Sequence, residues 1–367
     1  MRTRRAIARA ETVGSLLRPP ELLEARRRQA EDGGDPGRLR ELEDAAVLAA
    51  IRLQEVAGLD VITDGEMRRA GWAATTEALD GFEPRAGGPG LIWHGEGPDI
   101  RAGQGYPTVV RPIGERRSLA ADYAFLARHA TARAKHCLPA PSYHRRFWYP
   151  EHSRDAYGTC EEFLLAVRDY ERGVVARLVE LGCDYVQLDA PNYGTLCDVE
   201  NRGMLEARGH DLDAELDFDA ALDSSVFEGF GGLTRALHVC RGNAAGRWHS
   251  SGGYGLIAER LFPRLDVDVL LLEYDSDRAG GFEPLRHVRP GAVAVLGLLT
   301  TKSGALEDRG AVEERIAEAA RTKPLDELAL SPQCGFASVA VGNPLTPAEQ
   351  RAKLELVAAV AHRIWGR

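Results

Sequence analysis

The chain has 367 residues, of which 44% are hydrophobic and 28% charged, and its formal net charge is −9. This is the composition of a folded globular protein, and its acidic balance argues against nucleic acid as a partner. No apolar run reaches the roughly 18–20 residues that cross a membrane, and the basic start lacks the hydrophobic stretch of a signal peptide. Because of this, we expect no membrane partner. Six cysteines without CxxC spacing indicate a reducing, cytoplasmic compartment.

Short β-branched or apolar runs predict eight strands, at residues 11–15, 59–65, 135–141, 184–190, 234–240, 268–274, 292–300 and 327–334. Longer amphipathic stretches predict helices at residues 39–58, 160–183, 310–324 and 345–365. Glycines close the first two helices, and Thr346 followed by Pro347 is a typical start for the last. Strands that alternate with helices indicate a parallel sheet. Eight of them favour a single (β/α)8 TIM-type barrel over residues 1–367 rather than an open sheet.

Two segments depart from the repeating pattern. Residues 81–113 are rich in glycine and proline and contain two short β-like runs, which predicts a hairpin excursion packed on the barrel. Residues 191–232 contain many acidic residues and are expected to form a long, partly helical connection.

Polar side chains gather at the predicted strand ends, where a barrel of this kind carries its active site. His238 and Cys240 lie two residues apart in one strand and therefore share a face. Glu273 follows three leucines, and a buried carboxylate there is costly unless it is paired. Together with Cys334 these residues offer two thiols, an imidazole and a carboxylate, a plausible tetrahedral Zn²⁺ set. The alternative is that each cysteine is a small buried hydrophobe and the histidine satisfies a hydrogen bond in the core.

Several short motifs of the sequence resemble those of a known family. "TVGSLLRP", "TDGEMRR", "VQLDAP", "LHVC", "LLLEYD" and "LSPQCGF" occur in the order found in the catalytic barrel of cobalamin-independent methionine synthase. The resemblance runs from about residue 10 to the C-terminus, and "HVCRGN", "SGGYG" and "SPQCGFAS" resemble the short, single-barrel branch. It implies a zinc ion held by His238, Cys240, Glu273 and Cys334.

The resemblance further implies that the substrates are a small-molecule thiol acceptor and a methyl donor. It places the amino acid of homocysteine on the turn Val13, Gly14 and Ser15, with Glu66 and Asp189 as the catalytic carboxylates that bind its amino group. Zinc would turn the acceptor thiol into a thiolate able to attack a methyl group.

Departures from the family pattern leave the donor open. The family's N-terminal barrel has no expected counterpart here, so methyltetrahydrofolate, methylcobalamin and a small sulfonium compound all remain candidates, and a corrinoid protein is a possible partner. Lys302 stands where the family has a catalytic histidine, in "GLLTTKSGALE". It either replaces that acid, although a lysine with an ordinary pKa is a weak one, or binds a substrate carboxylate or phosphate. The loop that contains Arg247, Trp248 and His249 either shapes the acceptor site or is an ordinary connection.

Two other functions remain open at this point. One is a zinc-dependent thiol alkyltransferase or lyase of the epoxide:coenzyme M type, and the other is a zinc- or ligand-binding protein without catalysis. Retention of Ser15, Glu66 and Asp189 favours an acceptor that carries an amino group, which coenzyme M lacks. The sequence does not predict an oligomeric state.

Overall fold

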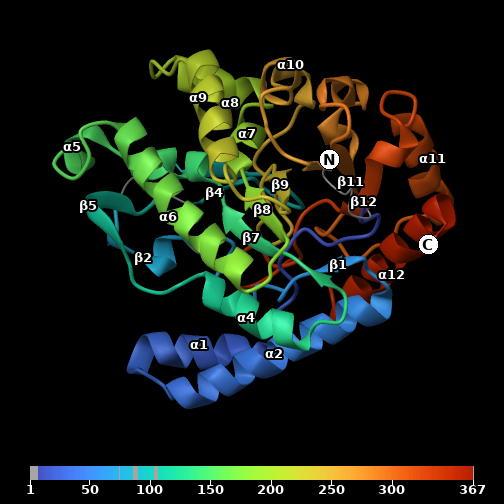
Figure 1. Ribbon diagram of the computed structural model, residues 1–367, viewed down its shortest axis with the longest axis horizontal. Helices are drawn as coiled ribbons and strands as arrows, with labels where there is room; N and C mark the ends of the chain where they lie inside the picture. Colours follow the sequence, from blue (N-terminus) through green and yellow to red (C-terminus); the bar gives the residue numbers. More distant parts are fainter. Residues whose placement is uncertain (1–6, 74, 86–89, 103–105, 367) are drawn as a thin grey trace.

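A sheet of six parallel strands forms the centre of the computed structural model, which describes residues 7–73, 75–85, 90–102 and 106–366. Neighbouring strands are hydrogen-bonded in the order β12-β11-β10-β9-β8-β7. Their bounds are β7 (His136–Pro139), β8 (Tyr185–Asp189), β9 (Thr234–Val239), β10 (Val269–Glu273), β11 (Val293–Leu299) and β12 (Leu328–Pro332). Six of the eight predicted strands therefore lie side by side in one sheet, surrounded by helices (Figure 1).

The N-terminal strands are shorter than the sequence predicts. β1 (Val61–Ile62) pairs in parallel with β6 (Arg133–Ala134), and β7 begins two residues after β6. Ala10 forms an isolated parallel bridge with Leu330 of β12, and Glu11 forms one with Val61. Hydrogen-bonded neighbours thus continue from β12 through residues 10–11 to β1 and β6.

The prediction of a strand over residues 11–15 is wrong beyond Glu11, because the backbone there serves a turn. The carbonyl of Gly14 accepts the hydroxyl of Thr63 at 2.6 Å, and the N–H of Leu16 donates to the carbonyl of Gly65 at 3.1 Å. These backbone groups are therefore not available to the sheet.

The predicted helices are present, with ends set by capping residues. They are α2 (Pro36–Ala57), α6 (Cys160–Glu180), α11 (Arg309–Ala319) and α12 (Pro347–Trp365). Thr346 caps α12 in a reciprocal capping box with Glu349, and Gly58 ends α2 with a φ of 86°. α11 is shorter than residues 310–324 because Pro324 disfavours helical backbone just before it. Two longer helices were not predicted, α1 (Pro20–Asp32) and α4 (Ala120–His129).

The long connection after β8 is partly helical, as the sequence predicts. It contains α7 (Pro191–Thr195), α8 (Val199–Glu206) and α9 (Leu212–Ser225). Shorter elements complete the described chain: α3 (Thr75–Ala78), α5 (Pro150–Ser153), α10 (Ala258–Leu261) and the 3-10 turns η1 (Pro141–Phe147), η2 (Tyr254–Leu256), η3 (Asp277–Ala279), η4 (Glu283–His287) and η5 (Leu325–Glu327).

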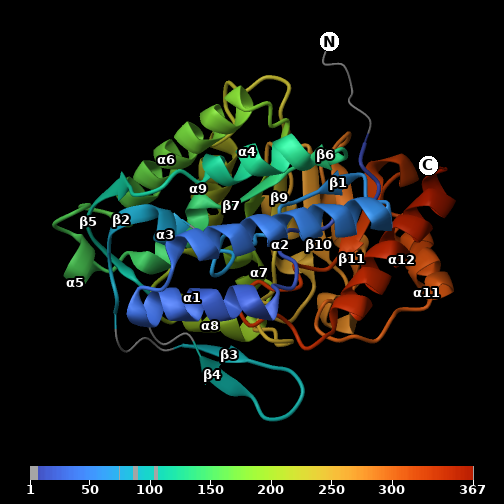
Figure 2. The ribbon, with the colours of Figure 1, turned by 90° about the horizontal axis from the view of Figure 1, so that it is seen from below.

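Residues 81–113, the expected hairpin excursion, contribute to two antiparallel strand pairs. β2 (Leu79–Glu83) pairs with β5 (Thr108–Glu115), and β3 (Leu91–Trp93) pairs with β4 (Ile100–Ala102). Residues 86–89 and 103–105 lie outside the described part. The β3–β4 pair extends from the body of the molecule (Figure 2) and is tied back to it by the bridge between His94 and Trp248.

Apolar side chains lie on both faces of the central sheet. Val13, Val61, Tyr185 and Leu271 belong to one buried cluster, and a larger cluster fills the space between the strands and the helices. This layered packing fixes the strand ends and therefore the side chains that follow them.

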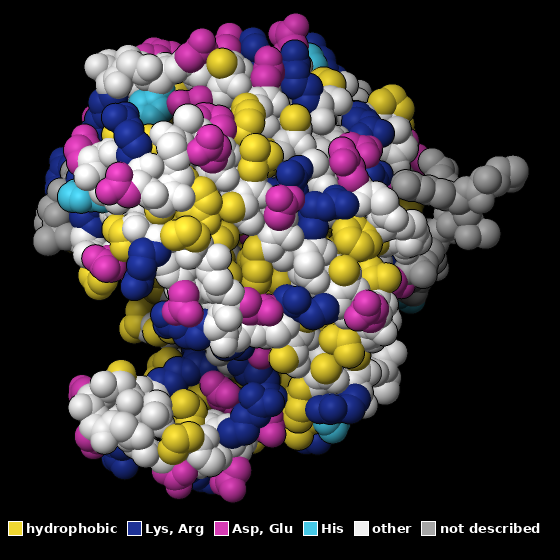
Figure 3. Space-filling model, turned by 60° about the vertical axis from the view of Figure 1, so that its left-hand side comes forward, with side chains coloured by type: hydrophobic (Ala, Val, Ile, Leu, Met, Phe, Trp, Pro, Cys, Tyr) yellow, Lys and Arg dark blue, Asp and Glu magenta, His cyan; other side chains and the backbone are white. Residues whose placement is uncertain are grey.

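The outside of the molecule is mixed in charge. On the face drawn in Figure 3, basic and acidic side chains are interspersed with apolar ones. Of the described helices, none combines the length and the apolar character that a membrane span requires.

Candidate metal centre and active site

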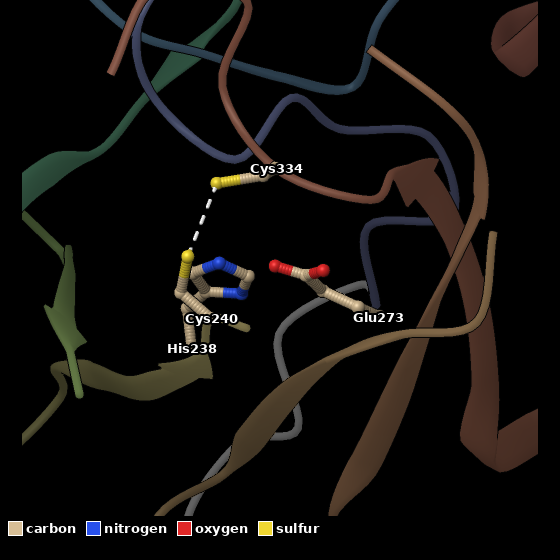
Figure 4. Close-up of side chains that lie close together, drawn as sticks. All are labelled: His238, Cys240, Glu273 and Cys334. Atoms are coloured by element: carbon tan, nitrogen blue, oxygen red, sulfur yellow. Dashed lines mark hydrogen bonds between the residues drawn. The ribbon is translucent and has the colours of Figure 1, made fainter. Parts of the chain in front are cut away.

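Four side chains meet at the ends of three strands (Figure 4). His238 lies in β9 and Cys240 directly after it, Glu273 is the last residue of β10, and Cys334 follows β12. Each offers a ligand atom, and these atoms all lie within 4.8 Å of one another. The two sulfur atoms are 3.6 Å apart and both cysteines are free thiols. The positions of these residues at the ends of the predicted strands predicted this convergence.

The cluster leaves two buried atoms without a hydrogen-bond partner. Nδ1 of His238 lies 3.3 Å from the carbonyl of Leu271 and must donate to it, which leaves Nε2 unpartnered. Glu273 accepts the backbone N–H of Arg241 on Oε1 at 3.0 Å, while its Oε2 has no hydrogen bond. Buried polar atoms are rarely left unpaired without a reason. A cation bound between them would satisfy both, and the donor set of two sulfurs, one nitrogen and one oxygen fits zinc.

The cluster favours the thiolate form of Cys334. The Cys240 thiol and His238 lower the pKa of Cys334 well below its ordinary value, and the same hydrogen bond raises the pKa of Cys240. Burial alone would lower the pKa of His238, but the neighbouring Cys334 raises it to about 9. Without a metal the cluster therefore holds protons that metal binding would release.

Lys302 lies behind the cluster. Its Nζ is 3.5 Å from Oδ2 of Asp275 and 4.0 Å from Oε2 of Glu273. Arg278 reaches the same two carboxylates, at 3.1 Å and 3.8 Å. Lys302 is not one of the described residues that line the pocket. Its charge thus lies against the buried carboxylate of Glu273, and its predicted role as an acid remains a prediction.

The predicted acceptor residues lie in the same pocket as His238, Cys240 and Cys334. Val13, Gly14, Ser15, Glu66 and Asp189 all line a cavity of about 200 Å³. Burial raises the pKa of Glu66 to about 7 and that of Asp189 to about 6. Each carboxylate would be stabilised by a cation, and an ammonium group is one that fits.

Local backbone strain positions Glu66. Its φ is 56°, in the left-handed region that side chains disfavour, and Asp64 accepts its N–H at 2.9 Å. A Cβ on Gly14 would lie 2.6 Å from Oε1 of Glu66, so a larger residue there would displace that carboxylate. Such outliers persist where the surrounding structure enforces them.

Gln187 connects two parts of the acceptor site and was not predicted. Its Nε2 donates to the carbonyl of Val13 at 3.0 Å and to Oδ1 of Asp189 at 2.7 Å. Its Oε1 accepts Nζ of Lys135 at 2.8 Å, and Lys135 in turn pairs with the buried Glu11. The sequence did contain a signal for this network: Glu11 and Lys135 are charged residues at the starts of otherwise apolar runs.

A further part of the pocket lining is aromatic. Trp72, Trp93, Tyr106 and Tyr143 line it, together with Arg146 and His249. Trp93 comes from the β3–β4 pair, and its ring meets the edge of His249 at 5.2 Å.

The loop after β9 anchors that strand pair. Arg247 donates to the carbonyls of Glu96 at 2.9 Å and Pro98 at 3.1 Å, and Trp248 stacks on His94 at 4.5 Å. Of the three loop residues that the sequence singled out, His249 faces the pocket and the other two hold the wall that covers it.

Comparisons with known proteins identify the family of the chain. Residues 9–362 match the family model described as the catalytic domain of cobalamin-independent synthase. The chain belongs to this family. The predicted relationship to cobalamin-independent methionine synthase is thereby confirmed, and the family is of the methyltransferase type.

Several known proteins resemble the chain along nearly its whole length. The uncharacterized proteins YxjH and YxjG of Bacillus subtilis (strain 168) are each 36% identical to it, over 99% and 97% of this chain and 96% and 94% of their own. A putative vitamin-B12 independent methionine synthase from Listeria monocytogenes is 28% identical, with a TM-score of 0.75 over 99% of this chain and 100% of that one.

A more distant structure shares the fold. The B12-independent methionine synthase from Shewanella sp. W3-18-1, solved with selenomethionine, is 21% identical, with a TM-score of 0.72 over 98% of each chain. These neighbours support a mixed α/β fold of the synthase type for the whole described chain.

Proposed function

We propose that this synthase-family protein is a zinc-dependent methyltransferase that moves a methyl group to the sulfur of a small thiol, most simply homocysteine, which becomes methionine. The observation that carries the proposal is that a sulfur-rich ligand cluster and a pair of buried carboxylates open into one cavity. The cluster suits a thiol and the carboxylates suit an ammonium group. An amino acid with a thiol side chain satisfies both.

The ligand set of the proposed metal is His238, Cys240, Glu273 and Cys334. Bound there, zinc would stabilise the acceptor sulfur as a thiolate. With two thiolates and one carboxylate the set carries one negative charge in excess of Zn²⁺, which keeps a bound sulfur electron-rich.

The remaining work falls to the protein's own groups. Glu66 and Asp189 hold the acceptor's ammonium group, and the turn of Val13, Gly14 and Ser15 positions the rest of the amino acid. This fixes the sulfur opposite the methyl group of the donor, which is worth a large part of the barrier to transfer. The sulfur forms its bond to the methyl carbon as the bond from that carbon to the donor breaks, and the electron pair leaves with the donor.

The fold that supports this chemistry is, in our proposal, a closed eight-position barrel within one catalytic domain. The bridges of Ala10 and Glu11 to Leu330 and Val61 support it, because they connect β12 to β1 where a first strand would lie. The site residues would then all lie at the C-terminal ends of the barrel strands, the usual place for catalysis.

The test is to supply the purified protein with homocysteine and each candidate donor: methyltetrahydrofolate, methylcobalamin and a methyl sulfonium compound. Methionine is measured by mass, together with zinc content. Without a histidine at position 302, the donor whose leaving nitrogen needs a proton is expected to be slower, since acid assistance is typically worth about 10²–10⁴-fold.

Coenzyme M, a thiol without an amino group, is the matched acceptor control. Methylation of homocysteine but not of coenzyme M supports the proposal. Equal use of both thiols, or a zinc-free protein with full activity, contradicts it.

A further inference from the structure

A second group of possible metal ligands lies beside the four-residue cluster. Glu66, Cys137 and Asp189 each offer one ligand atom, and these three atoms all lie within 4.8 Å of one another. Cys137 lies in β7, Asp189 is the last residue of the neighbouring β8, and Glu66 follows β1. None of the three is more than 8% exposed. An ion between the three atoms would need only small side-chain movements to reach ligand distances of about 2.0–2.3 Å.

The group has unused capacity to bind a cation. Glu66 lines the cavity, and its Oε2 is buried without a hydrogen-bond partner, although Nη1 of Arg69 lies 4.0 Å from its Oε1. A Cβ on Gly14 would lie 2.6 Å from Oε1 of Glu66 and 3.6 Å from Sγ of Cys137. A glycine there leaves the space beside both atoms open. Since buried polar atoms rarely remain unpaired without a reason, the free carboxylate oxygen points to a ligand.

The thiol decides which cations suit the group. Magnesium and calcium prefer oxygen ligands, whereas one sulfur with two carboxylates suits zinc or another thiophilic divalent ion. The thiol of Cys137 donates to the carbonyl of Val13 at 3.3 Å, and burial raises its pKa well above the ordinary value. A metal must therefore displace a proton from Cys137. This cost, and the presence of one sulfur instead of two, makes the group a weaker site than the four-residue cluster.

We propose that Glu66, Cys137 and Asp189 form a second, weaker site for a thiophilic divalent cation such as Zn²⁺. Two of its three ligands are the carboxylates that are proposed to hold the ammonium group of the acceptor. A cation bound there would therefore exclude the amino acid and inhibit the protein when metal is in excess. The inference rests on the proposed function only for the identity of the displaced ligand.

The experiment titrates the metal-free full chain with Zn²⁺ in a calorimeter and counts bound zinc by mass spectrometry after equilibrium dialysis. We expect two equivalents per chain, the second bound at least about 10-fold more weakly because it has fewer ligands and one sulfur less. Cys137→Ser and Glu66→Gln should each lose only the second equivalent, whereas Cys334→Ser should lose the first and retain the second. Mg²⁺ in place of Zn²⁺ should give no binding at this site.

Cys183→Ser is the matched control. Like Cys137, Cys183 is a buried thiol that donates to a backbone carbonyl at 3.3 Å. Among the described residues it belongs to neither group of possible ligands. This variant should bind two equivalents of zinc with the affinities of the wild type.

Methionine tests the overlap with the acceptor, because it carries the amino acid part without a free thiol that would bind zinc in solution. Saturating methionine should raise the Kd of the second equivalent by at least about 10-fold, as loss of a charged ligand to an ammonium group predicts. If Cys137→Ser and Glu66→Gln lose the second equivalent but methionine does not weaken it, the metal site stands and the place proposed for the amino group is wrong.

A single equivalent in the wild type at excess zinc would overturn the second site. A second equivalent that folded Cys137→Ser and Glu66→Gln variants both retain would also overturn it, because that zinc would be bound elsewhere on the protein.

Discussion

Two parts of the pocket are built in different ways: the metal end, with His238, Cys240 and Cys334, and the aromatic end, with Trp93, Tyr143 and Arg146. The metal end takes its residues from the ends of β9 and β10 and from the segment after β12, where parallel strands lock the backbone. The aromatic end takes its residues from the 3-10 turn η1, the β3–β4 pair and the loop after β9. A reacting atom needs the rigid framework of the sheet, whereas substrate choice can be left to the segments that cover it.

The two parts of the pocket also differ in the charged groups that line them. Glu66, Asp189 and Glu273 give the metal end three buried carboxylates, and burial raises the pKa of each. The aromatic end holds Arg146.

The largest expected effect comes from breaking the metal end. Cys240→Ser and Cys334→Ser should each lose most of the bound zinc and lower methyl transfer by more than about 100-fold, since even residues that only support metal ligands are worth 10–100-fold. Metal content by mass spectrometry and initial rates are the measurements. Cys160→Ser, in α6 and outside the cluster, should retain both. Full zinc content in both ligand variants would refute the assignment.

A smaller effect is expected from the acceptor carboxylates. Asp189→Asn and Glu66→Gln should each weaken binding of homocysteine by about 10–100-fold, the value of a charge-assisted hydrogen bond, with zinc content unchanged. Because the pKa values of the two groups are raised to about 6 and 7, wild-type affinity should fall as the pH drops below 7. A variant that binds homocysteine like the wild type would show that the amino group is held elsewhere.

A variant of Gln187 tests whether its hydrogen bond positions Asp189 for the acceptor. Gln187→Met removes the donor to Asp189 and should raise the KM for the acceptor about 5–10-fold, as loss of one hydrogen bond predicts. The KM for the donor should stay the same. Since the amide also lowers the pKa of Asp189, the pH at which acceptor binding is lost should move upward. A change in kcat alone, without that pH shift, would indicate a merely structural role.

The smallest effect concerns stability. Burial favours the protonated form of Glu66, with a pKa of about 7, so the empty protein should lose stability as the pH rises through 7. Glu66→Gln cannot ionise, and its melting temperature should exceed that of the wild type by about 2 °C at pH 8.5 and by less at pH 5.5. The exposed Glu77→Gln is the control in calorimetry. A difference that does not depend on pH would disprove the ionisation as its cause.

The sequence by itself predicts which four side chains come together as candidate metal ligands, and part of the reason is local. A spacing of two residues in a strand places His238 and Cys240 on one face, and the leucines before Glu273 mark a buried carboxylate that needs a partner. Similarly, Thr346 and Gly58 mark helix ends because capping involves only near neighbours. The strand at residues 11–15 was predicted too long because the backbone there is held by Thr63 and Gly65, 49 residues further along the chain.

Only the tertiary structure decides the aromatic end. Trp93 and His249 are separated by more than a hundred residues and meet because a bridge between His94 and Trp248 ties the strand pair to the body. No periodicity distinguishes Arg146, which faces the cavity, from Arg145, which pairs with Asp219. Likewise, Lys302 lies against Glu273 instead of lining the pocket. Periodic patterns encode which side chains share a face of one element, but contacts between distant segments depend on how the elements pack.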